Sequence, residues 1–388
     1  MIKSITFVSY RYPTSINPTH HVFVQQLVWA IADLGIKCNV ICPLPTNLNR
    51  RLRELPSQTI EKTPKNNTVK LYFPKYFSFG QRRIAGINSA YLTTLTFTKA
   101  VSKQLASLSQ KPDAVYGHFL TPAGVCVGKI AAKYKLPAFA AFGESSPWSI
   151  NNYGRKRIAK SLQPLAGIVS VSTENKRLLA SMGIFDASDI GVFPNAVQST
   201  RFYPRNKQQA REKFGFAQDA FIVAFVGQFS ERKGVLRVDK ALGGVDGISL
   251  AFAGKGDYLP TSPNTIHCKT VEPSDMPDFL SAADIFLLPT LNEGCCNAIV
   301  EAMACGLPIV SSNLPCNDDL LDKDNAILIN PRSLQEIRDA VLNLKNNPFL
   351  RDQMSKASLD KARTLTLDNR AKNIVHWMEQ QISKHRSI

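Results

Sequence analysis

The sequence lacks the features of a membrane-spanning protein, a disulfide scaffold or a zinc site. Charged residues, glycine or proline interrupt its apolar runs well before the roughly 18 residues that a spanning helix needs. Residues 1–9 have neither the long apolar stretch nor the cleavage site of a signal peptide, so we expect a cytoplasmic protein. The eight cysteines form no CxxC pair, which favours reduced, mostly buried thiols.

Acidic residues are scarce in the first half of the chain. Residues 1–200 contain 24 Lys and Arg but only 8 Asp and Glu, whereas residues 201–388 contain 23 and 22. Of the net charge of +17, the first half therefore carries +16. Such an asymmetry predicts that the first half faces an anionic partner, such as a membrane surface, a phosphorylated acceptor or nucleic acid.

Short apolar runs alternate with amphipathic segments over the whole chain. The predicted strands of the first half are 5–9, 40–42, 114–116, 138–142, 167–172 and 190–193. Those of the second half are 221–226, 248–253, 265–268, 285–288, 309–311 and 326–329. Because strands that alternate with helices form parallel sheets covered on both faces, we predict two doubly wound α/β domains, 1–196 and 197–366. A last amphipathic stretch, 369–382, has no strand after it and must pack on a domain already formed.

Residues 46–86 are an exception to this alternation and are predicted to be irregular. They interleave aromatic residues with lysine and arginine. One interpretation is a solvated loop. The other is an interfacial patch whose aromatic side chains enter the headgroup region while its cations attract anionic lipid. The cations of such a patch would be Arg50, Arg51, Arg53, Arg82 and Arg83.

The first candidate site is a glycine turn between a buried strand and a helix. Gly227 follows the strand 221–226, and Arg232 and Lys233 stand beside the predicted helix start. Unpaired N–H groups at a helix start, together with two cations, suit a phosphate or diphosphate. The alternative is a solvated basic first turn. The segment does not match the GxxxxGK[ST] pattern of a Walker P-loop.

The most specific stretch is 289–308, in which a strand end, a short loop and a helix follow one another. Glu293 lies in the loop, where the exposed amides of the helix start attract an anion or a hydroxyl-rich ligand. Glu301 lies about two turns further on, in a mostly apolar helix, so this acid needs a partner such as a ligand hydroxyl. Taken alone, the two acids are also compatible with one helix cap and one solvated side chain.

Together these segments resemble the GT-B glycosyltransferases, specifically glycosyltransferase family 4. The run from Glu293 to Glu301, followed by Ala302-Met303-Ala304, resembles the Glu-x7-Glu signature of that family. Residues 227–234 resemble its diphosphate-binding motif, and Pro194-Asn195-Ala196-Val197 its interdomain Pro-Asn-Gly-Val.

The first half resembles, more narrowly, bacterial polysaccharide-assembly members such as teichuronic-acid transferases. This resemblance rests on Tyr12-Pro13, on Val22-Phe23-Val24 and on residues 117–124. It implies two Rossmann-like domains facing across a cleft, with the N-terminal domain on the acceptor side. A C-terminal helix, 367–388, would pack back on that N-terminal domain.

The resemblance also implies roles for individual residues. Arg232 and Lys233 would neutralise the diphosphate of a nucleotide-sugar. Glu293 would hydrogen-bond a donor-sugar hydroxyl, and Glu301 would hold the ribose. His118 matches the family's cleft histidine and joins Arg232, Lys233 and Glu293 as a predicted catalytic residue, although a lone histidine in an apolar context can also be structural. The other predicted donor-binding residues are Gly227, Val271, Gly294, Cys295, Cys296 and Asn297.

Three segments depart from the family pattern. His20 and His21 stand where a glycine usually lets the backbone approach a phosphate, so either a histidine donates to the phosphate instead or the loop moves. Glu144 and Ser146 lie where His-Gly-x-Asp is common and are predicted acceptor-side contacts. The two adjacent cysteines after the first acid replace an aromatic and a small residue, and we expect them to affect donor selection.

The resemblance therefore implies a retaining hexosyltransferase. It would move a sugar from a nucleotide diphosphate sugar, a UDP-sugar or else GDP-mannose, to a lipid-linked or saccharide acceptor in cell-surface polysaccharide biosynthesis. No metal or other cofactor is expected, because two cations and a helix dipole take its place. The enzyme would lie peripherally on the cytoplasmic face of the inner membrane. The alternatives are a GT-B sugar-nucleotide epimerase and a basic nucleic-acid-binding protein, for which the sequence has no recognisable motif.

Overall fold

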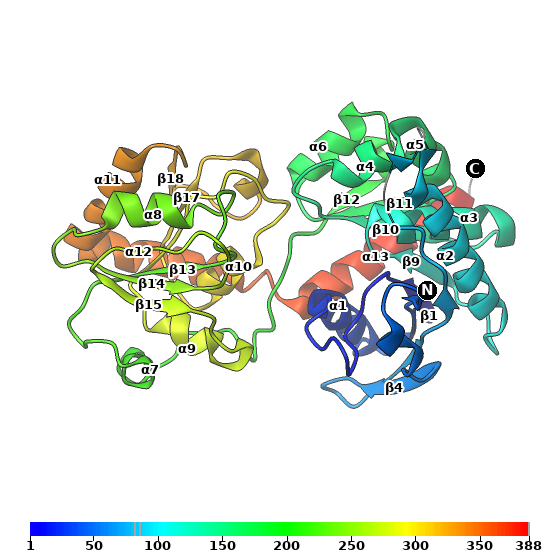
Figure 1. Ribbon diagram of the computed structural model, residues 1–388, viewed down its shortest axis with the longest axis horizontal. Helices are drawn as coiled ribbons and strands as arrows, with labels where there is room; N and C mark the ends of the chain where they lie inside the picture. The colour runs from blue at the N-terminus through cyan, green and yellow to red at the C-terminus, as the bar shows by residue number, and fades with distance from the viewer. Residues whose placement is uncertain (81–82, 85–86, 387–388) are drawn as a thin grey trace. The chain divides into compact units, whose positions relative to one another are not determined.

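The computed structural model describes residues 1–80, 83–84 and 87–386 and divides into two compact units. Unit 1 comprises Met1–Phe193 and the segment that begins at Leu367 (Figure 1). Unit 2 comprises Pro194–Thr366. Each unit is an α/β domain with a largely parallel sheet, as the sequence predicts for the fold class.

Unit 1 is built on eight strands in the order β12-β11-β10-β9-β1-β2-β5-β4. Its parallel strands are β1 (Ser4–Val8), β2 (Lys37–Ile41), β5 (Thr68–Tyr72), β9 (Ala114–Gly117), β10 (Ala138–Phe142), β11 (Gly167–Ser170) and β12 (Ile190–Val192). The edge strand β4 (Gln58–Lys62) pairs antiparallel with β5. Two short pairs lie outside this sheet: β3 (Leu44–Pro45) with β6 (Lys75–Tyr76), and β7 (Arg83–Ile84) with β8 (Ile87–Asn88).

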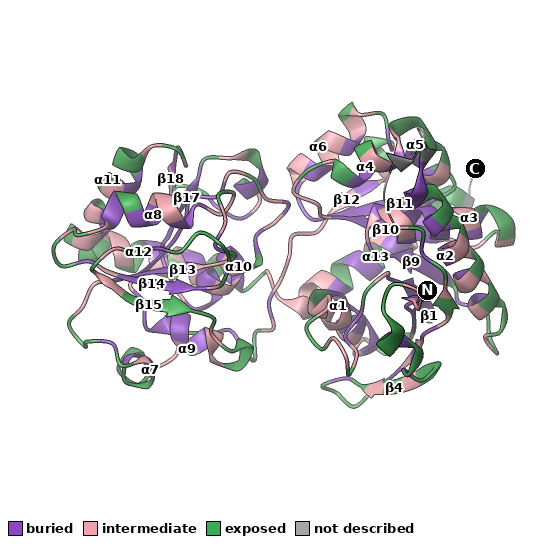
Figure 2. Cartoon of the chain, viewed as in Figure 1, coloured by how far each residue is buried: buried purple, intermediate pink, exposed green. Residues whose placement is uncertain are grey.

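Helices cover both faces of the sheet in unit 1 because alternate strand residues point to opposite faces. On β10, Phe139 and Ala141 belong to the core beneath α1 and α13, whereas Ala138, Ala140 and Phe142 belong to the core beneath α2, α3 and α5 (Figure 2). The helices of unit 1 are α1 (Val22–Ala32), α2 (Ser89–Ala106), α3 (Val125–Tyr134), α4 (Trp148–Tyr153), α5 (Arg155–Leu162), α6 (Thr173–Ser181) and α13 (Leu367–Arg386).

The prediction that residues 46–86 are irregular is wrong for much of this stretch. It contributes β4 and β5 to the large sheet and a short 3₁₀ turn, η1 (Arg50–Arg53), besides β6 and β7. On β5, Val69 and Leu71 are buried and alternate with exposed or half-buried residues, which is the pattern of a strand with one covered face. Lys70, on the other face of β5, interrupts the apolar residues and hid that alternation.

Unit 2 carries six parallel strands in the order β15-β14-β13-β16-β17-β18. They are β13 (Ile222–Val226), β14 (Ser249–Ala253), β15 (Thr265–Lys269), β16 (Ile285–Leu288), β17 (Ile309–Ser312) and β18 (Ala326–Ile329). The helices are α7 (Lys207–Phe214), α8 (Val235–Leu242), α9 (Met276–Ser281), α10 (Asn297–Ala304), α11 (Leu334–Asn346) and α12 (Pro348–Ala362). The order reverses between β13 and β16, so the loops that follow these two strands lie side by side.

Apolar cores hold both units together. The central parallel strands of each sheet, such as β1, β9 and β10 in unit 1 and β13, β16 and β17 in unit 2, are almost fully buried, as the apolar runs predict. All eight cysteines are free thiols, and six of them are buried. In the part of the chain that the structure describes, a transmembrane helix is not found.

Candidate functional site

Two loops of unit 2 leave the sheet where its strand order reverses. Residues 227–234 follow β13 and residues 289–296 follow β16, and Val223 and Ile285 pair in the parallel register of these strands. Open α/β sheets bind ligands outside the carboxyl ends of their strands at such a point. The predicted residues Arg232, Lys233 and Glu293 all lie on these two loops.

A single carboxylate oxygen joins the two loops. Oε1 of Glu293 accepts a hydrogen bond from Nη1 of Arg232 at 2.7 Å and lies 2.6 Å from Nζ of Lys233. Oγ1 of Thr290 donates to the same oxygen at 2.9 Å. The side chain of Lys233 is 13% exposed, that of Glu293 9% and that of Arg232 39%. Two cations therefore share one anion, which leaves one positive charge in excess for a second anion.

Further hydrogen bonds fix the two loops to each other. The N–H of Leu291 donates to the carbonyl of Arg232 at 2.8 Å, and Nη2 of Arg237 donates to the carbonyl of Pro289 at 2.8 Å. Arg232 and Lys233 lie in the turn before α8 rather than in its first helical residues. That turn ends at Gly234 with φ +83°, where a Cβ would lie 2.6 Å from the carbonyl oxygen of Pro289. Only glycine fits there, and it keeps both cations close to Glu293.

A third loop, after β14, touches the first. The N–H of Phe229 donates to the carbonyl of Lys255 at 2.9 Å. A Cβ on Gly254 would lie 1.9 Å from the carbonyl oxygen of Gly227, so the two backbones can approach only because residue 254 is glycine. Val271, a predicted donor-binding residue, follows β15 and packs, half-buried, on the core of unit 2.

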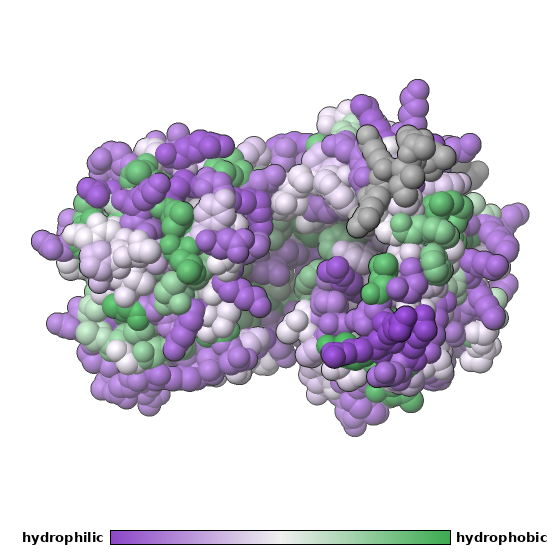
Figure 3. All heavy atoms as spheres, in the orientation of Figure 1, coloured by the Kyte–Doolittle hydropathy of each residue, from purple (hydrophilic) through white to green (hydrophobic). Residues whose placement is uncertain are grey.

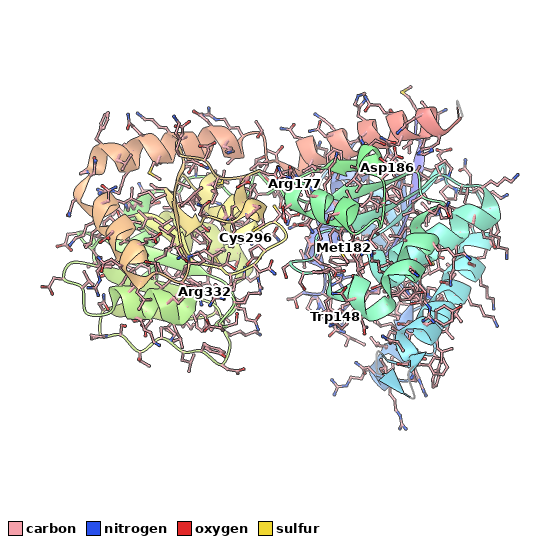
Figure 4. All side chains as sticks on the ribbon, turned by 90° about the horizontal axis from the view of Figure 1, so that it is seen from above. Trp148, Arg177, Met182, Asp186, Cys296 and Arg332 are labelled. Atoms are coloured by element: carbon pink, nitrogen blue, oxygen red, sulfur yellow. The ribbon has the colours of Figure 1, made fainter. Side chains whose placement is uncertain are left out.

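The residues before α10 are tied to the segment 194–197. The N–H of Asn195 donates to Sγ of Cys295 at 3.2 Å, and its Nδ2 donates to the carbonyl of Cys295 at 2.9 Å. Cys296 is buried at the start of α10 (Figure 4), and its Sγ lies 3.8 Å from Nζ of Lys233. Asn195 therefore positions the loop that carries Glu293, a link that the sequence does not reveal.

Glu301 lies on α10 and its carboxylate has no hydrogen-bond partner among the described side chains. Burial raises its pKa to about 7, and the positive charge of Arg201 partly opposes that rise. A half-buried carboxylate with unused acceptor capacity suits a ligand hydroxyl, as the sequence predicts.

Replacing Glu301 with Gln is expected to change how stability depends on pH. The folded carboxyl keeps its proton to about pH 7, whereas its ordinary pKa is 4.5, so the folded state binds more protons between these values. Wild-type stability should therefore fall, relative to Glu301→Gln, as pH rises through this window, by at most about 3 kcal/mol. Urea unfolding of both proteins at pH 5 and pH 8 measures the difference. A difference that is the same at both pH values would contradict the raised pKa of Glu301.

A second cluster forms in unit 1, beyond β1 and β9, where the strand order of that sheet reverses. The ring centroids of His118 and His21 lie 4.8 and 5.5 Å from that of Phe119, and 5.5 and 5.2 Å from that of Phe23. Within the described chain, Nδ1 of each histidine is buried without a hydrogen-bond partner. Burial lowers the pKa of His118 to about 3 and that of His21 to about 4, so both rings are neutral at pH 7.

Backbone conformation explains part of the departure from the family's glycine loop. His21 precedes α1 with φ +49°, in the left-handed region that a glycine adopts without strain. Its ring thereby meets Tyr10, a residue that sequence reasoning missed, at a centroid distance of 5.0 Å. Tyr10 comes two residues after β1, and this position just beyond a strand end is the feature of the sequence that could have identified it as a site residue.

The other predicted acceptor-side residues are less clearly part of this cluster. Glu144 is close enough to Tyr10 to raise the pKa of that phenol, although burial contributes more. Burial also raises the pKa of the Glu144 carboxyl, which accepts from the N–H of Ser149 at 3.3 Å. His20 is half-buried and close enough to His21 to help lower the pKa of that ring, although burial contributes most. Ser146 is exposed, and its side chain has no described contact with the cluster.

Comparisons with known proteins find similarity to glycosyltransferases. Residues 206–361 match the family model described as "Glycosyl transferases group 1". The chain is 24% identical over 365 residues to the teichuronic acid biosynthesis glycosyltransferase TuaC of Bacillus subtilis (strain 168), covering 90% of this chain and 91% of that one. The chain is a GT-B glycosyltransferase.

Two further relatives extend the comparison of this glycosyltransferase. An Escherichia coli UDP-Gal:alpha-D-GlcNAc-diphosphoundecaprenol alpha-1,3-galactosyltransferase is 26% identical over 201 residues, 47% of this chain and 52% of its own. The crystal structure of Anabaena Alr3699/HepE in complex with UDP has a TM-score of 0.74 at 13% identity, covering 98% of this chain and 100% of that one. The segment matched by the family model contains Arg232, Lys233, Glu293 and Glu301.

The predicted membrane cations of the glycosyltransferase lie partly within the described residues. Arg50, Arg51 and Arg53 form η1 and are exposed. Arg82 and the side chain of Arg83 lie outside the described residues. Among the described residues, no group of three His, Cys, Asp or Glu is arranged to hold a metal ion.

Proposed function

We propose that this glycosyltransferase transfers a sugar, with retention of configuration, from a UDP-sugar to a lipid-linked or saccharide acceptor in cell-surface polysaccharide biosynthesis. The observation that carries the proposal is the position of Oε1 of Glu293 between Arg232 and Lys233, with one positive charge in excess. TuaC is named for teichuronic acid biosynthesis, the Escherichia coli relative for a UDP-galactose donor and a diphosphoundecaprenol-linked acceptor, and the Anabaena structure for bound UDP. GDP-mannose is the second candidate donor.

Charge explains how this cluster would promote the reaction. Cleaving the bond between sugar and phosphate places negative charge on the leaving diphosphate, and fixed cations lower the energy of that transition state. Arg232 and Lys233 would bind the diphosphate, while Glu293 and the main-chain N–H groups of 294–297 orient the sugar. Glu301 would accept from the ribose hydroxyls. The two cations make a metal ion unnecessary for charge neutralisation.

Retention fits a same-face mechanism in which the leaving phosphate takes the proton of the attacking hydroxyl. The O–H bond of the acceptor and the sugar–phosphate bond break while a new glycosidic bond forms, and the proton moves to the phosphate. No second carboxylate is needed for this step. His118 stays a predicted catalytic residue, because a neutral imidazole with a free Nδ1 can exchange a hydrogen bond with a sugar hydroxyl.

The epimerase alternative is not favoured, because the family model and the named relatives describe glycosyl transfer. The nucleic-acid alternative rests on the net charge of +17, yet the chain's specific residues lie in the half that carries almost none of it.

Thermal unfolding with UDP, GDP, ADP and their sugar conjugates, in the presence of a chelator, tests the proposal. A ligand at 100 times its Kd stabilises the folded state by about 2.7 kcal/mol, which corresponds to a rise in Tm of the order of 5 °C. We expect UDP and a UDP-sugar to give this rise without metal, and Lys240→Ala, an exposed substitution on α8, to preserve it. A wild-type Tm unmoved by every nucleotide would overturn the proposal.

A further inference from the structure

The outer helices of unit 1 carry many cations and no acids. Helices α2, α3, α4 and α5 contain no Asp or Glu. None of their cations forms an ion pair with a described residue. These cations are Lys99, Lys103, Lys129, Lys133, Arg155, Lys156, Arg157 and Lys160. Unpaired charges of one sign on packed helices create a positive potential that attracts an anion.

Three of these cations line a cavity of about 540 Å³ whose walls come from α2, α3, α4 and α5. Nζ of Lys129 lies 5.6 Å, and Cζ of Arg157 5.7 Å, from the ring centroid of Tyr91. Lys160 is the third cation of the lining. A Cβ on Gly128 would lie 2.0 Å from the carbonyl oxygen of Ser161, so α3 and α5 are held in direct contact. Their cations thereby converge on one aromatic ring without a carboxylate between them.

Exposed apolar side chains stand next to this cavity. On α2, Leu92 and Leu95 are each 39% exposed and follow Tyr91 within about one helical turn. Phe77 and Phe79 are 55% and 45% exposed, and their ring centroids lie 5.0 Å apart. We call Phe77, Phe79, Leu92 and Leu95 the apolar rim. Figure 3 shows hydrophobic residues gathered over this part of unit 1.

Hydrogen bonds join the two halves of the apolar rim. Oγ1 of Thr96 donates to the carbonyl of Phe77 at 2.7 Å, and the N–H of Phe79 donates to Oγ1 of Thr93 at 2.9 Å. The loop 77–79 is therefore held on α2, beside the exposed leucines. Trp148, which begins α4 and is 56% exposed (Figure 4), adds an aromatic side chain of the kind enriched at membrane interfaces.

The combination identifies the partner by its chemistry. The lysines and the arginine of the cavity would suit a phosphate, and the apolar rim beside it would suit hydrocarbon. We propose that this face binds an anionic phospholipid bilayer, with a lipid phosphate in the cavity between Tyr91, Lys129 and Arg157 and the apolar rim in the acyl boundary. The inference rests on the proposed function only in giving the enzyme a lipid-linked acceptor to reach. The proposed main membrane contact is therefore on α2, α3 and α5, and not on the arginines of 46–86 that the sequence analysis named.

Sedimentation with phosphatidylcholine vesicles, with and without phosphatidylglycerol, tests this surface. We expect wild-type protein to bind only the anionic vesicles, and Lys129→Ala/Arg157→Ala to bind them at least about tenfold more weakly. Lys176→Ala/Arg177→Ala on α6 removes the same charge from the same unit and should bind like wild type. Lys129→Arg/Arg157→Lys keeps both charges and should restore binding, which separates lost charge from misfolding. Equal loss in both alanine pairs would overturn the proposal, because the attraction would then be diffuse.

Two further arms complete the test. Leu92→Ser/Leu95→Ser should also weaken binding to anionic vesicles, and full binding by this variant would exclude the apolar rim from the contact. Free glycerol phosphate should raise the Tm only slightly, whereas the protein should bind anionic vesicles. A large rise in Tm with free glycerol phosphate, without vesicle binding, would reassign the cavity to a soluble ligand.

The vesicle and UDP measurements fail independently. A wild type that responds to UDP but ignores vesicles contradicts the membrane surface alone. A wild type that binds vesicles but not UDP contradicts the proposed donor site alone.

Discussion

Lys233→Ala is expected to lower kcat/KM for the sugar donor by about 10²- to 10³-fold. Nζ of Lys233 lies 2.6 Å from Oε1 of Glu293, and its side chain is only 13% exposed, so little water screens its charge. Alanine removes one of the two cations that would neutralise the leaving diphosphate. The loss should appear in kcat as well as in KM, because negative charge on the diphosphate grows in the transition state.

Two matched variants sharpen this result. Arg232→Ala should cost less than Lys233→Ala, because the Arg232 side chain is 39% exposed and water already screens it. Lys240→Ala removes a lysine from the exposed side of α8 and should keep wild-type kinetics. Steady-state kinetics of the three variants with the donor identified by thermal unfolding supply the comparison. Wild-type kcat/KM in Lys233→Ala would remove this residue from the donor site.

The place of the unit 2 site could be predicted because strand periodicity locates the loops that leave a parallel sheet. Arg232 and Glu293 follow two apolar runs, and loops after such strands are where α/β proteins bind ligands. Periodicity does not give strand order, however. That β13 lies beside β16, although β14 and β15 intervene in the chain, follows from packing.

Contacts between distant segments could not be predicted from the sequence for a similar reason. Asn195 belongs to a motif that the sequence analysis singled out, yet nothing in that motif says that its side chain donates to the carbonyl of Cys295, 100 residues further along the chain. The strands β4 and β5 were missed because lysines on the exposed face and a glutamate on the covered face, Glu61, masked a short apolar alternation at Val69 and Leu71. The cavity beside Tyr91 depends on helix packing through Gly128, which no local pattern reports.

Glu293→Gln is expected to separate sugar transfer from nucleotide binding. In the free protein the carboxylate of Glu293 is the anion that Arg232 and Lys233 share. An incoming diphosphate must compete with it for both cations. The amide keeps an oxygen for the hydroxyl of Thr290 but gives up the negative charge, so UDP, which has no sugar to contact, should bind at least as tightly as to wild type.

Turnover should change in the opposite direction. If Glu293 orients the donor sugar through a charge-assisted hydrogen bond, its loss should lower kcat/KM by about 10²-fold while UDP binding persists. Calorimetric titration with UDP and steady-state kinetics measure the two quantities on the same preparation. Glu212→Gln, the same change at an exposed position of α7, serves as the control and should alter neither. Parallel loss of UDP binding and turnover would show instead that Glu293 acts by holding the two cations in place, and would leave the sugar contact to another residue.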